Sequence, residues 1–344
     1  MDKYTAEGMR GKNVNLSFII ASYNKKEYLE NAIHSCLEQD IEEFEIIIGD
    51  DGSNDGSIDL IKKFKERYPN IIEYFVQDRS EIEGDIIPSI RVSNVIFKGL
   101  DMASGKYCMV LAGDDYFYKS DFFSDAISFL DKHAEYSAYV GGYDMVWENK
   151  EPRHCFWRIT PRLYWSGAYI HISSFVFRKK IYTEGTLLSR FCDDTGLSYA
   201  LASEGKWCFD ETPVFAYRQR EDSITYSLGN FELAVVELLL FQDTLNKGKV
   251  ILQSLARFAV PLSVVYKNRK LFEEKKYRKY VVEGATQDNN IIGLICDYDK
   301  KTWTKKTMFF LGLLFCDICR ICFMFLIYFC RVSDKLRNCK IRKA

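Results

Sequence analysis

Prolines are scarce in this sequence, net charge is almost absent, and the N-terminus has no apolar leader. With 6 prolines in 344 residues and no low-complexity tract, long disordered linkers are not expected. The formal net charge of −1 gives no sign of a general nucleic-acid binder, so we expect no nucleic acid among its partners. Residues 1–13, an N-terminal extension, lack the apolar core of a signal peptide, which favours a cytoplasmic protein whose eleven cysteines are reduced thiols.

The first 130 residues alternate between short apolar segments rich in β-branched residues and segments with helical periodicity. Strands are expected at 14–20, 44–48, 71–76 and 106–112, and helices at 25–39, 57–68, 90–103 and 121–133. Alternation with short connections predicts a parallel sheet covered by helices. Further strands are expected at 137–147, 171–177 and 213–218, a short helix at 195–205, and helical structure from 228 onward.

Polar side chains gather where the first four expected strands end. The clusters are 22–24 (Ser-Tyr-Asn), 50–53 (Asp-Asp-Gly-Ser), 77–79 (Gln-Asp-Arg) and 113–115 (Gly-Asp-Asp). Ligands of such sheets bind beyond the carboxyl ends of the strands. The sequence therefore predicts a ligand site at this edge of the sheet.

Two of these clusters are acidic. The segment GDDGSNDGS (49–57) allows a tight turn in which carboxylates approach a ligand, or an ordinary strand–helix loop capped by Asn54 or Asp55. The pair Asp114 and Asp115 suits a hard cation such as Mg²⁺ or Mn²⁺ with a diphosphate completing its shell. The alternative, that one aspartate caps the next turn, explains only one of the pair.

A third acid pair, Asp193 and Asp194, precedes the expected helix at 195–205. Either it caps that helix, or one carboxylate is a general base that removes a proton from an attacking hydroxyl. His171 begins an expected strand, and both a structural histidine and a residue on the acceptor side are open for it. The other three histidines have no spacing typical of metal ligands.

These segments, in this order, resemble family-two glycosyltransferases, nucleotide-sugar-dependent enzymes that include many bacterial polysaccharide synthases. The resemblance runs from about Asn13 to Thr225. It is carried by SFIIASYNKKEYLENAIHSCLEQ, EIIIGDDGSNDGS, GLDMASGKYCMVLAGDDYF, HISSFVFRK, DDTGLSYALASEGK and YRQREDSIT. It implies an α/β fold of the GT-A type, in which a Rossmann-like, mostly parallel sheet is covered by helices.

The resemblance also implies residues of the donor site. Ala21, Tyr23 and Asp51 would line the base and ribose, with Asp50 at the strand end. Arg91 matches an arginine that some members use on the nucleotide.

The family's metal motif is usually Asp-x-Asp, and here it has changed. Ala112 stands at the first aspartate, followed by Gly113, whereas Asp114 keeps the main metal-ligand position. The resemblance therefore implies Mg²⁺ or Mn²⁺ bound through Asp114, with Asp115 as an acceptor-side or supporting residue.

Two further motifs carry over. Asp194 lies three residues before Leu197, as the family's catalytic base does before its leucine, and Asp193 stands where glutamate is common. Arg220 occupies a position where the family often has histidine, and as a fixed cation it could meet the diphosphate.

The C-terminal third has a different character. Met308–Cys330 is almost wholly apolar, apart from Asp317 and Arg320, and basic residues flank it on both sides. We expect an in-plane membrane helix on the anionic cytoplasmic face, with a packed or dimerising helix and a true span as alternatives. The expected domains are a GT-A catalytic domain at 14–227, a helical region at 228–304, and this membrane-associating helix and tail at 305–344.

The sequence thus predicts an inverting glycosyltransferase that moves a sugar from a nucleotide-sugar, UDP being the family's commonest nucleotide, to a hydroxyl of a glycan acceptor. The membrane-seeking tail suggests a lipid-linked oligosaccharide, as in capsule, O-antigen or exopolysaccharide assembly. A catalytically inactive, nucleotide-sugar-binding membrane scaffold is the alternative, suggested by Ala112 and Arg220. A nucleotidyltransferase would need a glycine-rich loop after the first strand, which ASYNKKEY lacks.

Overall fold

The structure is a computed structural model of the chain, which divides into two compact units. One unit holds residues 1–161 and 169–226, and is called the sheet unit below; the other holds 162–168 and 227–344. The structure describes residues 14–79, 88–118, 120–156, 170–183 and 194–220, and isolated positions between 234 and 271. The N-terminal extension at 1–13 and the expected membrane helix at Met308–Cys330 lie outside the described residues, as does nearly all of the region expected to be helical at 228–304.

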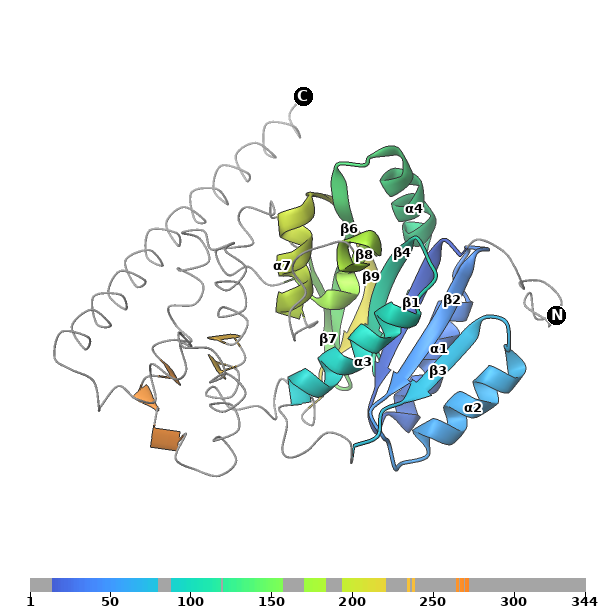
Figure 1. Cartoon of the computed structure of the whole chain (residues 1–344), viewed down its shortest axis with the longest axis vertical. Coiled ribbons are helices and arrows are strands. Elements are labelled where there is room, and N and C mark those ends of the chain that lie inside the picture. The colour runs from blue at the N-terminus through green and yellow to red at the C-terminus, as the bar shows by residue number, and fades with distance from the viewer. Residues whose placement is uncertain are drawn as a thin grey trace. The chain divides into compact units, whose positions relative to one another are not determined.

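The sheet unit alternates strands and helices along its first half, as expected (Figure 1). Its elements are β1 (Leu16–Ser22), α1 (Lys26–Leu37), β2 (Phe44–Asp50), α2 (Ser57–Arg67), β3 (Ile72–Val76), α3 (Pro88–Met102), β4 (Tyr107–Ala112), β5 (Tyr116–Phe117), α4 (Phe122–Lys132), β6 (Tyr136–Trp147), β7 (Lys150–Cys155), the 3₁₀ turn η1 (Ile172–Ser174), β8 (Phe175–Arg178), α6 (Lys180–Thr183), α7 (Asp194–Glu204) and β9 (Lys206–Arg218). The eight elements predicted before residue 134 are all present, with bounds that differ by at most two residues.

The strands join one sheet in the order β3-β2-β1-β4-β8-β6-β9-β5, and β7 pairs with β6. The four N-terminal strands β3, β2, β1 and β4 are parallel, which confirms the predicted parallel sheet for this half. Beyond β4 the sheet is mixed, because β8 runs antiparallel to both of its neighbours. The carboxyl ends of β1, β2, β3 and β4 therefore meet at one edge.

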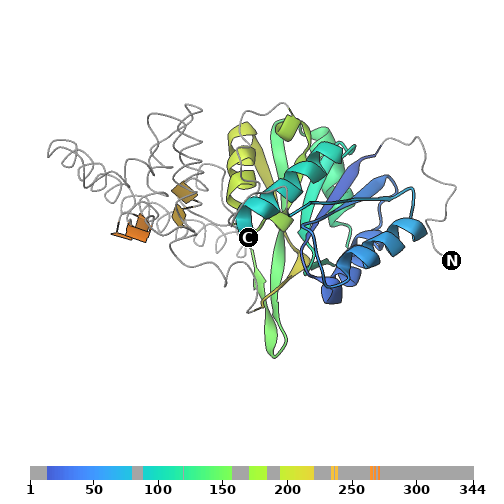
Figure 2. The same ribbon diagram turned by 60° about the horizontal axis from the view of Figure 1, so that its bottom comes forward.

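The later strands differ more from expectation. The segment expected as a strand at 171–177 begins instead with η1, because the side chain of His171 accepts a hydrogen bond from the Ser173 amide and turns the chain. Strand β9 begins at Lys206, seven residues before the predicted 213. Strands β6 and β7 form a hairpin that projects beyond the rest of the sheet (Figure 2).

Alternate residues of each central strand pack against different helices. In β1, Phe18 and Ile20 join a buried cluster with side chains of α1, α2 and α4. Ile19 faces the other way, toward α3, where a Cβ on Gly99 would come within 2.6 Å of it. Helices thus cover both faces of the parallel half-sheet, and burial of each large apolar side chain contributes about 1.5–3 kcal/mol. A ligand can approach these strands only at their ends.

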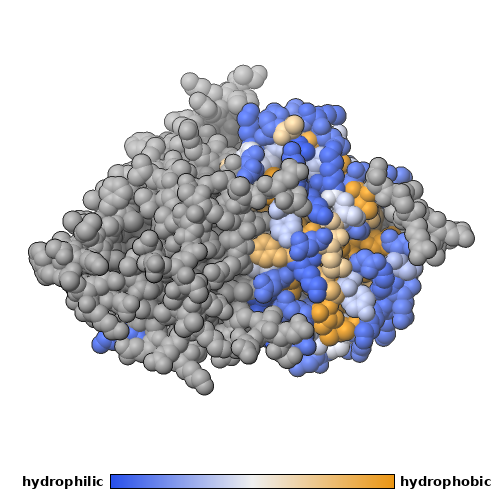
Figure 3. Space-filling model, in the orientation of Figure 1, coloured by the Kyte–Doolittle hydropathy of each residue, from blue (hydrophilic) through white to orange (hydrophobic). Residues whose placement is uncertain are grey.

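The surface of the sheet unit offers no broad apolar area on the side seen in Figure 3, where hydrophobic residues form small separate patches among hydrophilic ones. Among the helices that the structure describes, none combines the length and the apolarity that crossing a bilayer requires.

Candidate functional site

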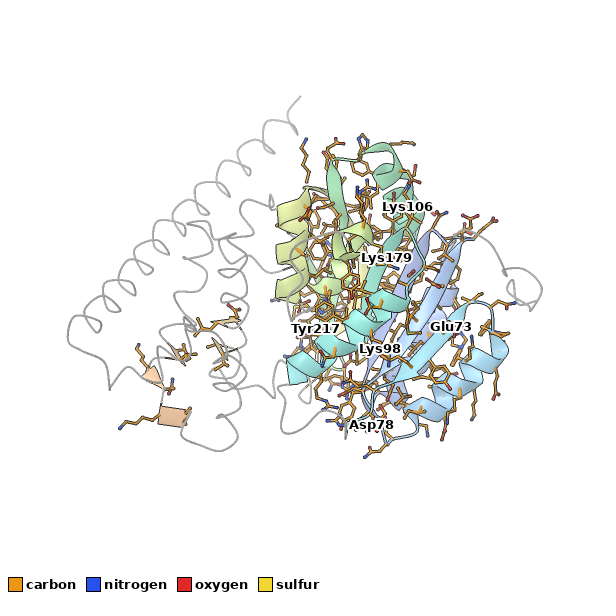
Figure 4. The ribbon with its side chains drawn as sticks, viewed as in Figure 1. Glu73, Asp78, Lys98, Lys106, Lys179 and Tyr217 are labelled. Atoms are coloured by element: carbon orange, nitrogen blue, oxygen red, sulfur yellow. The ribbon has the colours of Figure 1, made fainter. Side chains whose placement is uncertain are left out.

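The predicted clusters do converge at the carboxyl edge of the parallel strands. Ser22 pairs in register with Asp50, Asp50 with Val76, and Ala21 with Ala112, so the four loops start side by side. Figure 4 shows Asp78, just after β3, at this edge, and Lys106, just before β4, at the opposite one. The predicted convergence of these polar loops at one edge of the sheet is confirmed, and a ligand site there stays a prediction.

Hydrogen bonds tie the loop after β1 to the loop after β2. The amide of Asn24 donates to Ser53 Oγ at 2.8 Å, the Asn54 amide donates to Asn24 Oδ1 at 3.0 Å, and the Lys25 amide donates to Ser57 Oγ at 3.2 Å. Asn24 adopts a left-handed backbone with φ of 50°, which asparagine tolerates better than most residues. The two loops therefore form one rigid support for whatever binds above them.

In the segment 49–57, Asp55 binds amides at two helix starts, although the N-cap residue of α2 is Gly56. One oxygen of Asp55 accepts from the Ser57 amide at the start of α2, and the other accepts from the Lys26 amide at the start of α1. A single carboxylate thus accepts from the first amide of each helix, and Gly56, with φ of 94°, supplies the turn between Asp55 and α2.

Asp50 holds the turn after β2 from within. It is buried, and its two oxygens accept from the amide and the hydroxyl of Ser53, each at 2.7 Å. Burial raises its pKa, which the Ser53 hydrogen bonds oppose. These contacts give Asp50 a part in shaping the loop, and its contact with a nucleotide stays a prediction.

Asp51 is the centre of a buried cationic network. Arg91 binds it in bidentate fashion, with Nε 2.7 Å from Oδ2 and Nη2 2.8 Å from Oδ1. Gln77 donates to Oδ1 at 2.6 Å and Arg79 to Oδ2 at 3.1 Å, so four donors occupy the roughly four lone-pair positions of the carboxylate. The Arg79 guanidinium also lies over the Tyr23 ring, 4.0 Å from its centroid. The predicted residues Tyr23, Asp51 and Arg91 come together here.

Asp114 lies at the other side of the edge, beyond β4. Its Oδ2 is 2.6 Å from the ammonium of Lys25 and 3.6 Å from Nη1 of Arg220. Gly113 approaches β1 closely, since its amide donates to the Ala21 carbonyl at 2.8 Å. The structure thus brings the predicted Ala21, Gly113, Asp114 and Arg220 together, and adds Lys25.

Asp115 points into the protein. Its Oδ1 accepts from the Arg218 amide at 2.9 Å, while its buried Oδ2 has no hydrogen-bond partner among the described residues. Burial, and then the neighbouring Asp114 charge, raise the pKa of Asp115 well above its usual range. Arg218 in turn donates to the Asp114 carbonyl, and its guanidinium lies over the ring of Tyr116. Asp115 therefore anchors the segment that carries Asp114, rather than facing a ligand.

Asp194 is the first residue of α7, and Asp193 lies outside the described residues. The Ile172 amide donates to Asp194 Oδ1 at 2.5 Å, so η1 fixes the orientation of this carboxylate. Ser198 donates its hydroxyl to the Asp194 backbone carbonyl. The two alternatives for Asp194, a residue at the helix start and a general base, are compatible. Its side chain lies at the start of α7 and is oriented by the Ile172 amide, which belongs to η1.

His171 is buried beside Asp194, in contact with the rings of Tyr217 and Phe215 at centroid distances of 4.5 and 4.9 Å. Its Nδ1 accepts from the Ser173 amide. Burial lowers its pKa, and the Asp194 and Asp114 carboxylates oppose that shift. The charges of both carboxylates, the predicted base and the predicted metal ligand, therefore act on this imidazole.

Whether the site fits a divalent cation depends on its donors. Within the described ranges no group of three or more His, Cys, Asp or Glu side chains is arranged to hold a metal. Asp114 offers one oxygen, Oδ1, that accepts no hydrogen bond from the residues described, and Mg²⁺ is commonly held by one or two carboxylates and substrate phosphates. The residues therefore fit a metal that arrives with a diphosphate.

Several site residues were missed from the sequence. Lys25 and Arg218 lie in the segments ASYNKKEY and YRQREDSIT that carry the family resemblance, but no role was assigned to either residue. Gln77 and Arg79 carried a signal, because they belong to the polar cluster after β3, but a role in the site was not assigned to them.

The family model described as glycosyl transferase family 2 matches residues 17–186. The chain is 34% identical over 93 residues to the uncharacterised glycosyltransferase YfnE of Bacillus subtilis, covering 26% of this chain and 24% of YfnE. It is 27% identical over 137 residues to TuaG of Bacillus subtilis, provisionally assigned as a teichuronic acid biosynthesis glycosyltransferase, covering 40% of this chain and 50% of TuaG. The chain thus spans at most half the length of these two relatives.

Two solved structures share the fold. TarS of S. aureus in complex with UDP-GlcNAc has a TM-score of 0.53 and 17% identity, over 78% of this chain and 80% of that one. The mannosyltransferase PcManGT of Pyrobaculum calidifontis, in complex with GDP-Man and Mn²⁺, has a TM-score of 0.51 and 13% identity, over 92% and 90%. The predicted GT-A fold is confirmed by these neighbours.

Proposed function

Because the chain belongs to glycosyl transferase family 2 over residues 17–186, we propose that it is a glycosyltransferase that moves a sugar from a nucleotide-sugar to a hydroxyl of a glycan, in the synthesis of a cell-surface polysaccharide. The observations that support the proposal are that the Asp51 network and the cation-paired Asp114 lie at one sheet edge, and that the Asp194 carboxylate is held in one orientation by the Ile172 amide.

We assign the nucleoside to the Asp51 side of the edge. Tyr23 is 40% exposed and offers one ring face to a base, while Arg79 lies over the ring. Arg91 and Asp51 set the floor of this subsite, and Ala21 leaves room for the ribose where a larger side chain would intrude. We propose a UDP-sugar as the donor; TarS, which shares the fold, binds UDP-GlcNAc.

We assign the diphosphate to the Asp114 side. Gly113 lets the backbone approach the phosphates, and Arg220 supplies a fixed positive charge beside them. Asp114 would hold Mg²⁺ or Mn²⁺ through its open oxygen, and this cation, when bound, neutralises charge that develops on the departing diphosphate. Asp115 acts indirectly, by anchoring this segment from below.

We assign the general base to Asp194. The Ile172 amide holds its carboxylate in one orientation, so the proton of an acceptor hydroxyl meets a fixed oxygen. Attack by that hydroxyl opposite the leaving diphosphate inverts the anomeric carbon. The neutral, buried His171 lines the same region on the acceptor side, and Asp193 would precede the base in sequence. For the acceptor we propose a lipid-linked oligosaccharide at the cytoplasmic face of the membrane, on the ground of the apolar segment Met308–Cys330 and its basic flanks. TuaG, which the chain resembles, is provisionally assigned to the biosynthesis of a polysaccharide, teichuronic acid.

The test is thermal unfolding of the protein with UDP, GDP, CDP and dTDP, each with and without Mn²⁺. A ligand at 100 times its dissociation constant adds about 2.7 kcal/mol of stability. We expect one nucleotide to stabilise the protein, more strongly with Mn²⁺, and no nucleotide effect at all would contradict the donor site.

A second measurement separates the enzyme from an inactive scaffold. We expect Asp194→Asn to keep nucleotide binding while transfer to an acceptor falls by about 10²–10⁴-fold. Unchanged turnover in this variant removes Asp194 as the base. Nucleotide binding without any turnover in the unmodified protein favours the scaffold.

A further inference from the structure

A lysine is paired with the carboxylate that would bind the metal. Lys25 follows Asn24 in the loop after β1, and its ammonium reaches Asp114, which lies 89 residues later in the chain, at 2.6 Å. The side chains of Lys25 and Asp114 are only 18% and 15% exposed, so water screens this ion pair less than it would screen a pair on the open surface.

The loop gives the lysine little choice of position. Its amide donates to Ser57 Oγ, and the neighbouring Lys26 amide donates to Asp55, so the backbone of Lys25 is fixed at the start of α1. From this anchor only the flexible side chain moves. The ammonium can move by several ångströms without any change in the backbone, since lysine carries it on a flexible stem of four carbons.

The charges around Asp114 favour an anion over a second cation. Lys25 and Arg220 both approach Oδ2, and the Arg218 guanidinium donates to the backbone carbonyl of the same residue. A divalent ion at Asp114 would lie beside the Lys25 ammonium and be repelled by it. A diphosphate at the same place would attract that ammonium and leave the carboxylate open.

We propose that Lys25 is a diphosphate-binding residue, and that its ion pair with Asp114 excludes a divalent cation until a diphosphate draws the ammonium away. The proposal rests on the proposed function, since it assigns an order of events to the same donor site: Lys25 passes from Asp114 to the phosphates, and the metal then takes Asp114 together with those phosphates. No covalent bond changes in this exchange.

The test uses Lys25→Met in the full chain with two separate probes, Mn²⁺ alone and inorganic pyrophosphate in EDTA. Mn²⁺ alone, followed by its electron paramagnetic resonance signal, should bind the variant about tenfold more tightly, because its competitor at Asp114 is gone. Pyrophosphate, followed by calorimetry, should bind about tenfold more weakly, because a phosphate ligand is gone; each tenfold change corresponds to about 1.4 kcal/mol. Lys26→Met is the matched control. It removes the same charge from the neighbouring residue, whose side chain is exposed and is not paired with Asp114 in the structure.

The two shifts of opposite sign are what a purely structural role of Lys25 would not produce, because general damage to the loop weakens both ligands together. Asp114→Asn should shift both affinities in the opposite directions, so that pyrophosphate binds more tightly and Mn²⁺ more weakly. This variant tests the proposal if Lys25→Met does not fold. Equal weakening of both ligands, no change in either, or no binding of either probe to any of the proteins overturns the proposal. Failure of the proposed function has a different signature, in which the opposite shifts are seen but no nucleotide stabilises the unmodified protein.

Discussion

Asp51 and Asp114 are both aspartates at the same edge of the sheet, yet their surroundings differ. Asp51 receives four donors from Arg91, Arg79 and Gln77, and its side chain is 6% exposed. Asp114 receives one close donor on one oxygen, from Lys25, and its other oxygen takes none from the described residues.

The difference indicates that Asp51 has a structural role, whereas Asp114 can bind a ligand. A carboxylate whose lone pairs are all satisfied by protein donors can accept nothing more, so Asp51 positions Arg91, Arg79 and through them the Tyr23 ring. A carboxylate with an open oxygen and a displaceable partner can exchange ligands, as Asp114 can. The predictions below test that division, from the largest expected effect to the smallest.

The largest effect should come from Asp51→Ala. Removing one partner of a buried ion pair leaves Arg91 charged and uncompensated, which costs about 3–5 kcal/mol of unfolding free energy. Urea denaturation followed by circular dichroism measures it. The matched control is Glu73→Ala on β3, which breaks an ion pair with Lys65 of 2.6 Å whose glutamate is 56% exposed, and should cost about 1 kcal/mol or less. Equal losses in the two variants would mean that Asp51 is not the support described here.

Asp114→Asn should behave in the opposite way. We expect a smaller loss of unfolding free energy than for Asp51→Ala without ligands, because Lys25 and Arg220 are less buried than Arg91 and can turn toward water. The added stability that Mn²⁺ gives in the presence of a nucleotide should be lost. Thermal unfolding with and without the two ligands measures both quantities, and a metal effect that survives the substitution removes Asp114 as the ligand.

The pH dependence of stability should reveal the titration of the buried His171. Burial lowers its pKa below the unfolded value of about 6.5, so below that value the unfolded state binds more protons and stability falls as pH falls. His171→Phe, which suits the surrounding aromatic rings, removes this titration. As the pH falls from 7 to 5, the unfolding free energy of His171→Phe should rise relative to that of the unmodified protein, by at most about 1.4 kcal/mol per pH unit. A constant difference across this range would contradict the direction given.

The smallest effect should come from Arg79→Met, at the exposed side of the Asp51 network. Loss of the cation over Tyr23 should weaken nucleotide binding about fivefold, since such contacts contribute about 0.5–1 kcal/mol at exposed sites. Lys98→Met is the control, because it removes a similar contact with the Phe75 ring from the exposed face of α3. Calorimetric titration with the stabilising nucleotide compares them; an equal change in both points away from the Tyr23 subsite.

Much of the parallel half-sheet could be read from local patterns. Alternation of apolar strands with amphipathic helices set the elements through α4 except β5, and the polar clusters at the strand ends converge at one edge as expected. Elements that depend on long-range pairing or on side-chain contacts were harder to predict. Strand β5 has two residues and exists only because Tyr116 and Phe117 pair with β9, and η1 replaced an expected strand because His171 caps its own turn.

The site followed the same division. Tyr23, Asp51, Arg91, Asp114, Arg220 and Asp194 were all named from ordered motifs, because short-range spacing carries that information. Whether an aspartate is saturated or open could not be read, because its partners come from other loops. Asp50 and Asp51 are adjacent in the sequence, yet one is bound by Ser53 within its own turn and the other by Arg91 from α3.

The sequence by itself thus determined the strands and helices of the parallel half-sheet, the edge at which its polar loops converge and the family that the motifs resemble, since these depend on periodicity and on the order of neighbouring residues. Only the tertiary structure decided that Lys25 meets Asp114 across 89 residues and that Asp115 turns inward beneath it. The physical reason is that charge pairing depends on distances of a few ångströms, and for residues far apart in the chain packing sets those distances.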